Sequence, residues 1–270
     1  MAHEARAEVH VDAVPEAVWR ALTDPALVRE YFFGTTLVTD WRVGSPIVYR
    51  GEWEGRAYED RGTVLEVDRP RRLVTDYFSP SSGLPDEPGN HQRVTYEVAP
   101  EDGGSRVTIV QDGNRDDEGA QHAAANWASV LGGLRDVAAR VDTVVARFEV
   151  TGWEPAPLTG LDGDWLGAVV MRKAYTSGIR GTSVAHFVSS GAEESGRGYL
   201  AAERIEGTLA DGRAGAVTIH HGALQHPDDP SAFLYVVPGT GTGDLAGVTG
   251  TGRIVHDAEG ASLVLDLDRS

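Results

Sequence analysis

The sequence predicts an α+β domain that is followed by an all-β domain. Two short helices near the N-terminus are marked by prolines, and a set of alternating strand segments follows them. A long helical period then runs to about residue 142, and beyond it apolar and polar residues only alternate over short, glycine-punctuated runs. This change of period predicts a first domain over residues 1–143 and a second domain over residues 144–270.

The first helix is predicted to begin at Pro15, because a proline loses no hydrogen bond in a first helical turn. Apolar residues at spacings of three and four give this helix one apolar face. The helix should end at Thr23-Asp24-Pro25, and these residues can also cap a second short helix, Ala26 to Tyr31. The alternation over Ala7–Val11 predicts a short edge strand just before the first helix.

Further strands are predicted where apolar and polar residues alternate, at residues 47–53, 73–78, 93–98 and 106–111. Pro100–Gly104 has the composition of a hairpin turn between the last two. From Asp116 to about Asp142 the apolar positions step by three and four, which predicts one long helix. Gly132-Gly133 inside it costs about 1 kcal/mol per residue relative to alanine. The pair either lets the helix pack closely on the sheet or opens space above a ligand.

The segments Val14–Pro25 and Trp41-Arg42-Val43-Gly44 resemble the opening of the START-like SRPBCC superfamily, and specifically its heat-shock-ATPase-activator-like branch. The resemblance covers about residues 5–142. It implies a helix-grip fold, in which a curved sheet holds a long C-terminal helix over an apolar cavity. The matching motifs are structural, so the resemblance carries over no catalytic residue.

The second domain begins with a strand at residues 144–150, without a linker rich in Pro, Gly or Ser before it. Strands at spacings of about ten residues favour an antiparallel barrel or a sandwich. Three segments, Gly198–Leu209, Gly212–Gly215 and Pro238–Gly250, resemble an uncharacterised bacterial family with an allene-oxide-cyclase-like, calycin-type barrel. This resemblance spans about residues 146–268 and implies that the second domain is a barrel.

The composition excludes several classes of function. The net charge of −17 is divided into −9 for residues 1–147 and −8 for residues 148–270, so neither half offers the basic face that nucleic-acid binding requires. The absence of cysteine excludes disulfides, thiolate nucleophiles and Cys-ligated zinc. The chain has neither an apolar run long enough to span a membrane nor a hydrophobic stretch behind its first residues. We therefore expect a cytoplasmic protein without nucleic-acid or membrane partners.

Glu203 and His221 are the candidate catalytic residues. They have matching parity on two successive predicted strands. A three-residue turn Asp211-Gly212-Arg213, with Gly212 at positive φ, would place them directly opposite each other. A carboxylate beside an imidazole in a barrel interior could act as an acid–base pair. The alternative is a buried structural ion pair or hydrogen bond that closes the barrel.

No metal and no cofactor is expected. His220 and His221 are adjacent in a strand, so their side chains point to opposite faces and cannot converge on one ion. No Gly-x-Ser-x-Gly motif supports a serine nucleophile. Lys173 is the only lysine, and we expect a solvated residue at a strand end rather than a Schiff-base nucleophile.

Several residues are candidates for binding a ligand. In the first domain they are Trp53, Tyr77, Tyr96 and Trp127 between the sheet and the long helix, together with His122 and Asn126 near the cavity mouth. In the second domain Tyr199 shares the parity of Glu203 and is a further candidate. The structural alternative is that the aromatic side chains belong to the ordinary hydrophobic core and that His122 and Asn126 are exposed or cap a helix.

We therefore expect a two-domain protein that binds a small hydrophobic or aromatic molecule in its cavities, without established catalysis. The first alternative is a cofactor-independent cyclase, isomerase or hydrolase acting on a hydrophobic intermediate, since such sites leave weak sequence marks. The second is a stress-response or co-chaperone accessory, which only the name of the resembling branch implies. A homodimer is left open.

Overall fold

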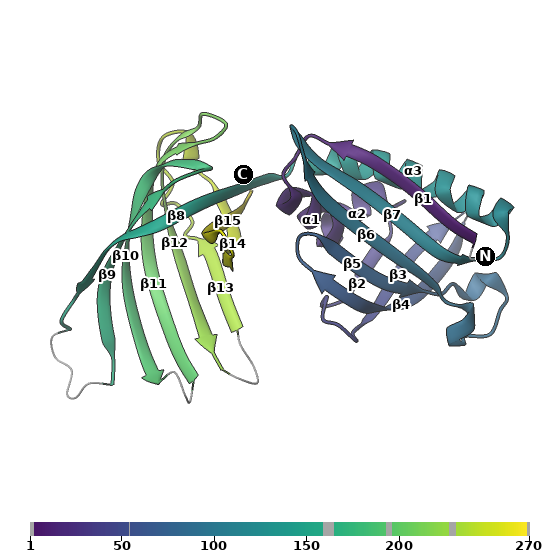
Figure 1. The fold of residues 1–270 in the computed structure, drawn as a ribbon, viewed down its shortest axis with the longest axis horizontal. Coiled ribbons are helices and arrows are strands. Elements are labelled where there is room, and N and C mark those ends of the chain that lie inside the picture. Colours follow the sequence, from purple (N-terminus) through teal and green to yellow (C-terminus); the bar gives the residue numbers. More distant parts are fainter. Residues whose placement is uncertain (1–2, 54, 159–164, 193–195, 227–230, 269–270) are drawn as a thin grey trace. The chain divides into compact units, whose positions relative to one another are not determined.

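The computed structural model describes residues 3–53, 55–158, 165–192, 196–226 and 231–268. The chain divides into two compact units, Met1–Val141 and Asp142–Ser270 (Figure 1). Both units are built mainly from antiparallel strands, and the α-helices within the described residues lie in the first unit.

The first unit contains a seven-stranded sheet in the order β1-β7-β6-β5-β4-β3-β2, with three α-helices (Figure 1). Its elements are β1 (His3–Val11), α1 (Pro15–Thr23), α2 (Pro25–Tyr31), β2 (Thr36–Val38), β3 (Pro46–Trp53), β4 (Arg56–Asp68), β5 (Arg72–Tyr77), β6 (Gln92–Glu101), β7 (Gly104–Asn114) and α3 (Asp117–Ala138). Two 3-10 helices, η1 (Pro80–Ser82) and η2 (Pro88–Asn90), interrupt the connection from β5 to β6. The long helix packs on the sheet through Leu131, Leu134 and Val137. This arrangement fits the expected helix-grip fold.

The helix boundaries follow the predicted capping residues, except at the end of α3. Asp24 caps α2 by accepting a hydrogen bond from the backbone N–H of Ala26 at 2.9 Å, as its position predicted. The helix α3 ends at Ala138 instead of near Asp142. Its last turn is tightened, because the N–H of Val141 donates to the carbonyl of Ala138, three residues earlier.

Of the Gly132-Gly133 pair, only Gly133 has a packing role, and its neighbour is α2 rather than the sheet. A Cβ atom on Gly133 would lie 2.7 Å from the Cβ atom of Tyr31, whereas one on Gly132 would meet nothing within 4 Å. Gly133 therefore allows α3 to approach α2 closely. The expectation that the pair brings α3 close to the sheet was therefore wrong, because the element that Gly133 approaches is α2.

In the second unit eight antiparallel strands pair in a cyclic order, β10-β11-β12-β13-β14-β15-β8-β9, in which β9 also pairs with β10 (Figure 1). They are β8 (Asp142–Pro155), β9 (Gly167–Tyr175), β10 (Ile179–Ala192), β11 (Gly196–Leu209), β12 (Ala214–Gln225), β13 (Ser231–Val236), β14 (Thr249–Asp257) and β15 (Gly260–Asp268), with a 3-10 helix η3 (Gly243–Leu245). The β13–β14 contact is the thinnest, with the single registered pair Tyr235↔Thr251. We call this arrangement the strand ring.

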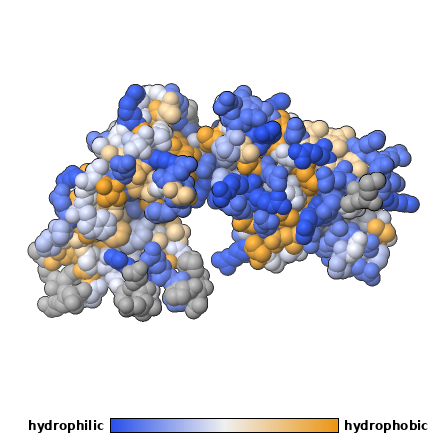
Figure 2. All heavy atoms as spheres, in the orientation of Figure 1, coloured by the Kyte–Doolittle hydropathy of each residue, from blue (hydrophilic) through white to orange (hydrophobic). Residues whose placement is uncertain are grey.

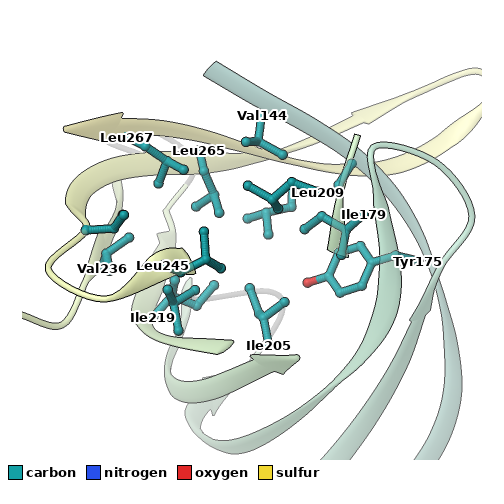
Figure 3. Packing of buried hydrophobic residues seen from close by; sticks show 14 of the residues in the cluster. Val144, Tyr175, Ile179, Ile205, Leu209, Ile219, Val236, Leu245, Leu265 and Leu267 are labelled. Carbon is teal, nitrogen blue, oxygen red and sulfur yellow. The ribbon is translucent and has the colours of Figure 1, made fainter. Parts of the chain in front are cut away.

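An apolar cluster fills one end of the strand ring. Figure 3 shows its side chains converging from the surrounding strands and from η3, which contributes Leu245. The cavity that remains among Ile179, Ile205, Leu209 and their neighbours measures only about 10 Å³, roughly the space of one water molecule. This end of the ring is therefore packed core.

The surface agrees with the acidic composition. Hydrophilic residues predominate on the visible face of the first unit (Figure 2), as expected for a chain with a net charge of −17. A high net charge of one sign keeps a protein soluble through mutual repulsion.

We predict that each unit folds without the other. Fragments 1–143 and 144–270 should each unfold in a single cooperative transition, because each unit has its own buried apolar cluster. Urea denaturation followed by circular dichroism checks this. If both fragments are insoluble or molten while the full chain is stable, the division at residue 143 is wrong.

Candidate functional site

The candidate residue Glu203 lies in the interior of the strand ring, fully buried on β11. Its directly opposite partner on β12 is Ile219, whereas His221 lies opposite Ala201. The predicted register was therefore wrong by two residues. Because a shift of two keeps every side chain on its face, Glu203 and His221 still share the interior. Their side chains meet diagonally, with His221 Nε2 3.1 Å from Glu203 Oε2.

The register differs because the hairpin turn begins one residue earlier than predicted. The N–H of Gly212 donates to the carbonyl of Leu209 at 3.0 Å, and the N–H of Leu209 donates to the carbonyl of Arg213 at 2.8 Å. The three loop residues are therefore Ala210, Asp211 and Gly212. Gly212 has φ of +91° at the third loop position, where a type I turn needs a left-handed residue before the next strand.

The carboxylate of Glu203 accepts hydrogen bonds from four side chains. Lys173 Nζ and His221 Nε2 donate to Oε2 at 2.7 and 3.1 Å. The hydroxyls of Ser183 and Tyr175 donate to Oε1, the second at 3.3 Å. Since an ionised carboxylate has about four acceptor positions, these donors occupy all of them.

The surroundings hold Glu203 in its charged form. Burial alone would raise the pKa of Glu203, but the hydrogen bond from His221 and the charge and hydrogen bond of Lys173 outweigh it and lower the pKa to about 2. A group that stays ionised and whose acceptor positions are occupied cannot exchange protons near neutral pH. The low pKa and the four donors make Glu203 a weak base near neutral pH.

Lys173 contradicts the prediction of a solvated lysine, because its side chain is only 4% exposed. Besides its bond to Glu203, the ammonium lies 4.4 Å from the centroid of the Phe148 ring, a cation–π contact. Sequence reasoning overlooked a usable signal here. Lys173 has the same parity in its strand as Met171 and Tyr175, whose side chains face the interior. Parity likewise predicts an inward Ser183.

His221 has one ring nitrogen directed at Glu203 and the other at Tyr199. Because the ionised carboxylate only accepts hydrogen bonds, Nε2 carries the proton that faces it, and in the neutral ring Nδ1 is an acceptor. The Tyr199 hydroxyl lies 3.4 Å from this Nδ1 atom. Burial and the charge of Glu203 raise the pKa of Tyr199, so it remains a neutral phenol. The acid–base capacity of the site thus lies with His221 and Tyr199.

An aromatic row lies on the same inward face, on the side of Glu203 away from the packed core. It consists of Trp153, Phe187 and Tyr199, with ring centroids 5.8 Å apart for the first pair and 4.7 Å for the stacked second pair. The registered pairs Trp153↔Met171, Met171↔Ala185 and Ala185↔Glu203 establish the shared face. Trp153 is nevertheless 53% exposed. The Trp153 side chain therefore shares the inward face and keeps contact with solvent.

In the first unit the structure contains a small apolar cavity of about 30 Å³ between the sheet and the helices. Tyr96 and Trp127 line it, as predicted from their positions, together with Phe32 and Tyr49. Trp127 also donates a hydrogen bond from Nε1 to Gln111 Oε1 at 2.6 Å. Ligand pockets usually measure about 300–1,000 Å³, so this cavity has no room for a drug-sized molecule unless side chains move.

Among the described side chains, the predicted residues Tyr77, His122 and Asn126 are not part of the cavity lining. Tyr77 instead donates its hydroxyl proton to Asp60 Oδ2 at 2.6 Å. His122 and Asn126 are exposed on α3, which agrees with the alternative of an exposed role. They lie on the polar face of α3, away from the face that carries its buried residues. Trp53 ends β3, but its side chain lies outside the described residues.

Within the described ranges no group of three or more His, Cys, Asp or Glu residues is arranged to hold a metal ion. The described helices also include none with the length and hydropathy to cross a bilayer.

Two family models match the chain. Residues 12–139 match the family described as activator of Hsp90 ATPase homolog 1-like protein, which is of the SRPBCC type. Residues 144–268 match a family described as protein of unknown function DUF3224. The N-terminal part of the chain is therefore similar to the Hsp90 ATPase activators, and the C-terminal part is similar to the DUF3224 family. The comparison with curated proteins found no match.

Several solved structures are similar to part of the chain. A protein from Cytophaga hutchinsonii is 41% identical, with 49% of this chain and 91% of that chain covered and a TM-score of 0.45. A DUF3224 protein from Shewanella oneidensis is 22% identical, with 48% and 98% covered and a TM-score of 0.43. The Aha1 dimer from Colwellia psychrerythraea is 15% identical, with 51% and 96% covered and a TM-score of 0.41.

Removal of Lys173 should destabilise the second unit strongly. We expect Lys173→Met to lower the free energy of unfolding by about 3–5 kcal/mol, because it leaves the buried Glu203 charge without its cation. The double variant Lys173→Met/Glu203→Leu should recover part of this loss, since it removes both charges but leaves three buried donors without their acceptor. Urea titrations of the three proteins measure the effect. A single variant as stable as the parent protein would contradict a buried ion pair.

The low pKa of Glu203 also predicts a specific dependence of stability on pH. The pKa is about 2 in the folded protein against an ordinary 4.5, so the ionised form stabilises the fold above pH 4.5 and this contribution is lost as the pH falls towards 2. The difference in unfolding free energy between the parent protein and Glu203→Gln should shrink over that interval. Denaturant titrations at several pH values test this, and a constant difference would refute it.

Proposed function

We propose that this chain binds a small aromatic or hydrophobic molecule against the aromatic row of the strand ring, without established catalysis. The observation that carries the proposal is the aromatic row Trp153, Phe187 and Tyr199, which faces inward yet leaves Trp153 53% exposed. A large apolar side chain that faces inward and keeps contact with water favours a ligand site over ordinary core.

The polar layer beneath the row supports the same proposal. Sites for small molecules combine apolar walls with a few fixed polar groups that orient the ligand. Tyr199 brings a hydroxyl to the boundary between the two layers, and His221 lies directly behind it. Glu203 and Lys173 fix that boundary, because both are buried and bonded to each other. A ligand ring would extend the aromatic row, and its polar end would contact Tyr199.

The fold that we propose for this domain is the allene-oxide-cyclase-like, calycin-type barrel. The cyclic strand order supports it, and such barrels hold small ligands at their open ends. The cavity beside Tyr96 and Trp127 in the first unit is a second candidate site. Its volume of about 30 Å³ makes binding there depend on movement of its lining side chains.

Catalysis by the same site is the first alternative. A cofactor-independent cyclase, isomerase or hydrolase would use His221 and Tyr199 to move a proton on a bound hydrophobic intermediate, and the hydrogen bond from His221 to Glu203 favours it. Glu203 would then orient the imidazole.

The match of residues 12–139 to activators of the Hsp90 ATPase favours another candidate, a stress-response or co-chaperone accessory. Stimulation of an Hsp90-type ATPase by the full chain would support it. A cytoplasmic location and a homodimer remain predictions from the sequence.

The proposal predicts binding of a planar apolar probe at the aromatic row. Naphthalene should bind the parent protein, and Phe187→Ala should weaken binding at least about tenfold, because stacked aromatic contacts and apolar burial are both lost. Phe233→Ala is the matched control, since Phe233 is 46% exposed and lies on the opposite parity to Leu234, which is buried inside the ring. Chemical shifts of backbone amides in β10 and β11 measure affinity and location. Absence of binding, or equal effects of the two variants, would refute the site.

A further inference from the structure

We infer that the ligand of the strand ring carries a hydroxyl group on a planar ring or double bond, as in a phenol or an enol, and that this hydroxyl is held between Tyr199 and His221. The inference rests on the proposed function, which places an apolar ring against the aromatic row. It adds the chemical class of the ligand and the two residues that recognise it.

The distance between Tyr199 and His221 is the first argument. The Tyr199 oxygen and His221 Nδ1 are 3.4 Å apart, longer than an ordinary hydrogen bond from a hydroxyl. Their rings meet edge to face with centroids 5.7 Å apart. The two groups are thus close enough to contact one ligand atom together and too far apart to satisfy each other fully.

The hydrogen-bonding state of the two groups is the second argument. Tyr199 presents an O–H donor. The His221 tautomer with its proton on Nε2, facing Glu203, presents an acceptor at Nδ1. A ligand hydroxyl satisfies both, because its oxygen accepts from Tyr199 while its proton is donated to His221. A ligand carbonyl or ether only accepts and would leave Nδ1 unpaired, and a buried unpaired group is costly.

The charges behind the pair are the third argument. Glu203 and Lys173 lie on the far side of His221 and compensate each other at 2.7 Å. Ser183 and Tyr175 donate to the same carboxylate, so the layer offers a ligand no free charge to pair with. A carboxylate on the ligand would only accept, and an ammonium would only donate. The site therefore favours a neutral group that both donates and accepts.

Three probes that differ in one substituent separate these possibilities: naphthalene, 2-methoxynaphthalene and 2-naphthol. We expect the parent protein at neutral pH to bind 2-naphthol about tenfold or more tightly than naphthalene, with 2-methoxynaphthalene close to naphthalene, because only the hydroxyl satisfies both groups. Tyr199→Phe should reduce the preference for 2-naphthol at least about threefold, while naphthalene binding changes little. Amide chemical-shift titrations give all the affinities.

Tyr235→Phe is the matched control. Tyr235 also has a histidine partner, with its hydroxyl 3.1 Å from His220 Nδ1, but this pair is exposed and its residues alternate with the inward His221 and Leu234. It should leave the preference unchanged. Near-ultraviolet circular dichroism verifies that both variants fold.

The outcomes distinguish this inference from the proposed function. If naphthalene binds and Phe187→Ala weakens it, but 2-naphthol binds no more tightly or keeps its preference in Tyr199→Phe, the hydroxyl inference is wrong and the binding site stands. If 2-methoxynaphthalene matches 2-naphthol, acceptance from Tyr199 alone explains recognition and the role of His221 is refuted. If no probe binds, the proposed function fails and the inference fails with it.

Discussion

The second unit depends on one buried negative charge. A carboxylate that is withdrawn from water must be compensated by a cation and by hydrogen bonds, or it loses its charge. Around Glu203 on β11 the compensating groups come from three other strands, with Lys173 and Tyr175 on β9, Ser183 on β10 and His221 on β12. A slip of one residue in any of these pairings would turn its donor away from the carboxylate. The charge therefore couples the register of four strands.

This constraint divides the interior of the ring into layers. Apolar side chains such as Leu209 and Leu265 fill one end, the Glu203 layer follows, and the aromatic row with the exposed Trp153 lies beyond it. All acceptor positions of the carboxylate are taken by protein donors, so it influences a ligand only through His221. It does so by holding the imidazole proton on Nε2. The functional consequence is a rigid polar floor beneath an apolar site, with Tyr199 at the boundary.

The interior of the first unit is packed with largely apolar side chains instead of around a buried charge. Its cavity is lined by Tyr96, Trp127 and other largely apolar side chains, and burial raises the pKa of Tyr96 well above its usual range. No ion pair in the described part of this unit is as deeply buried as Lys173 and Glu203. The functional chemistry that the structure suggests is therefore concentrated in the second unit, although the first has the more specific sequence motifs.

The sequence by itself determined the local structure. Prolines and Asp24 place the starts of α1 and α2, and the three-and-four spacing predicts α3, because backbone geometry and capping are local effects. Parity was enough to put Glu203 and His221 on one face. Only the tertiary structure decided which atoms meet, since the turn that ends at Gly212 shifted the register by two residues. The same holds for Lys173 and Phe187, which belong to neighbouring strands, so only the assembled ring brings them to the site.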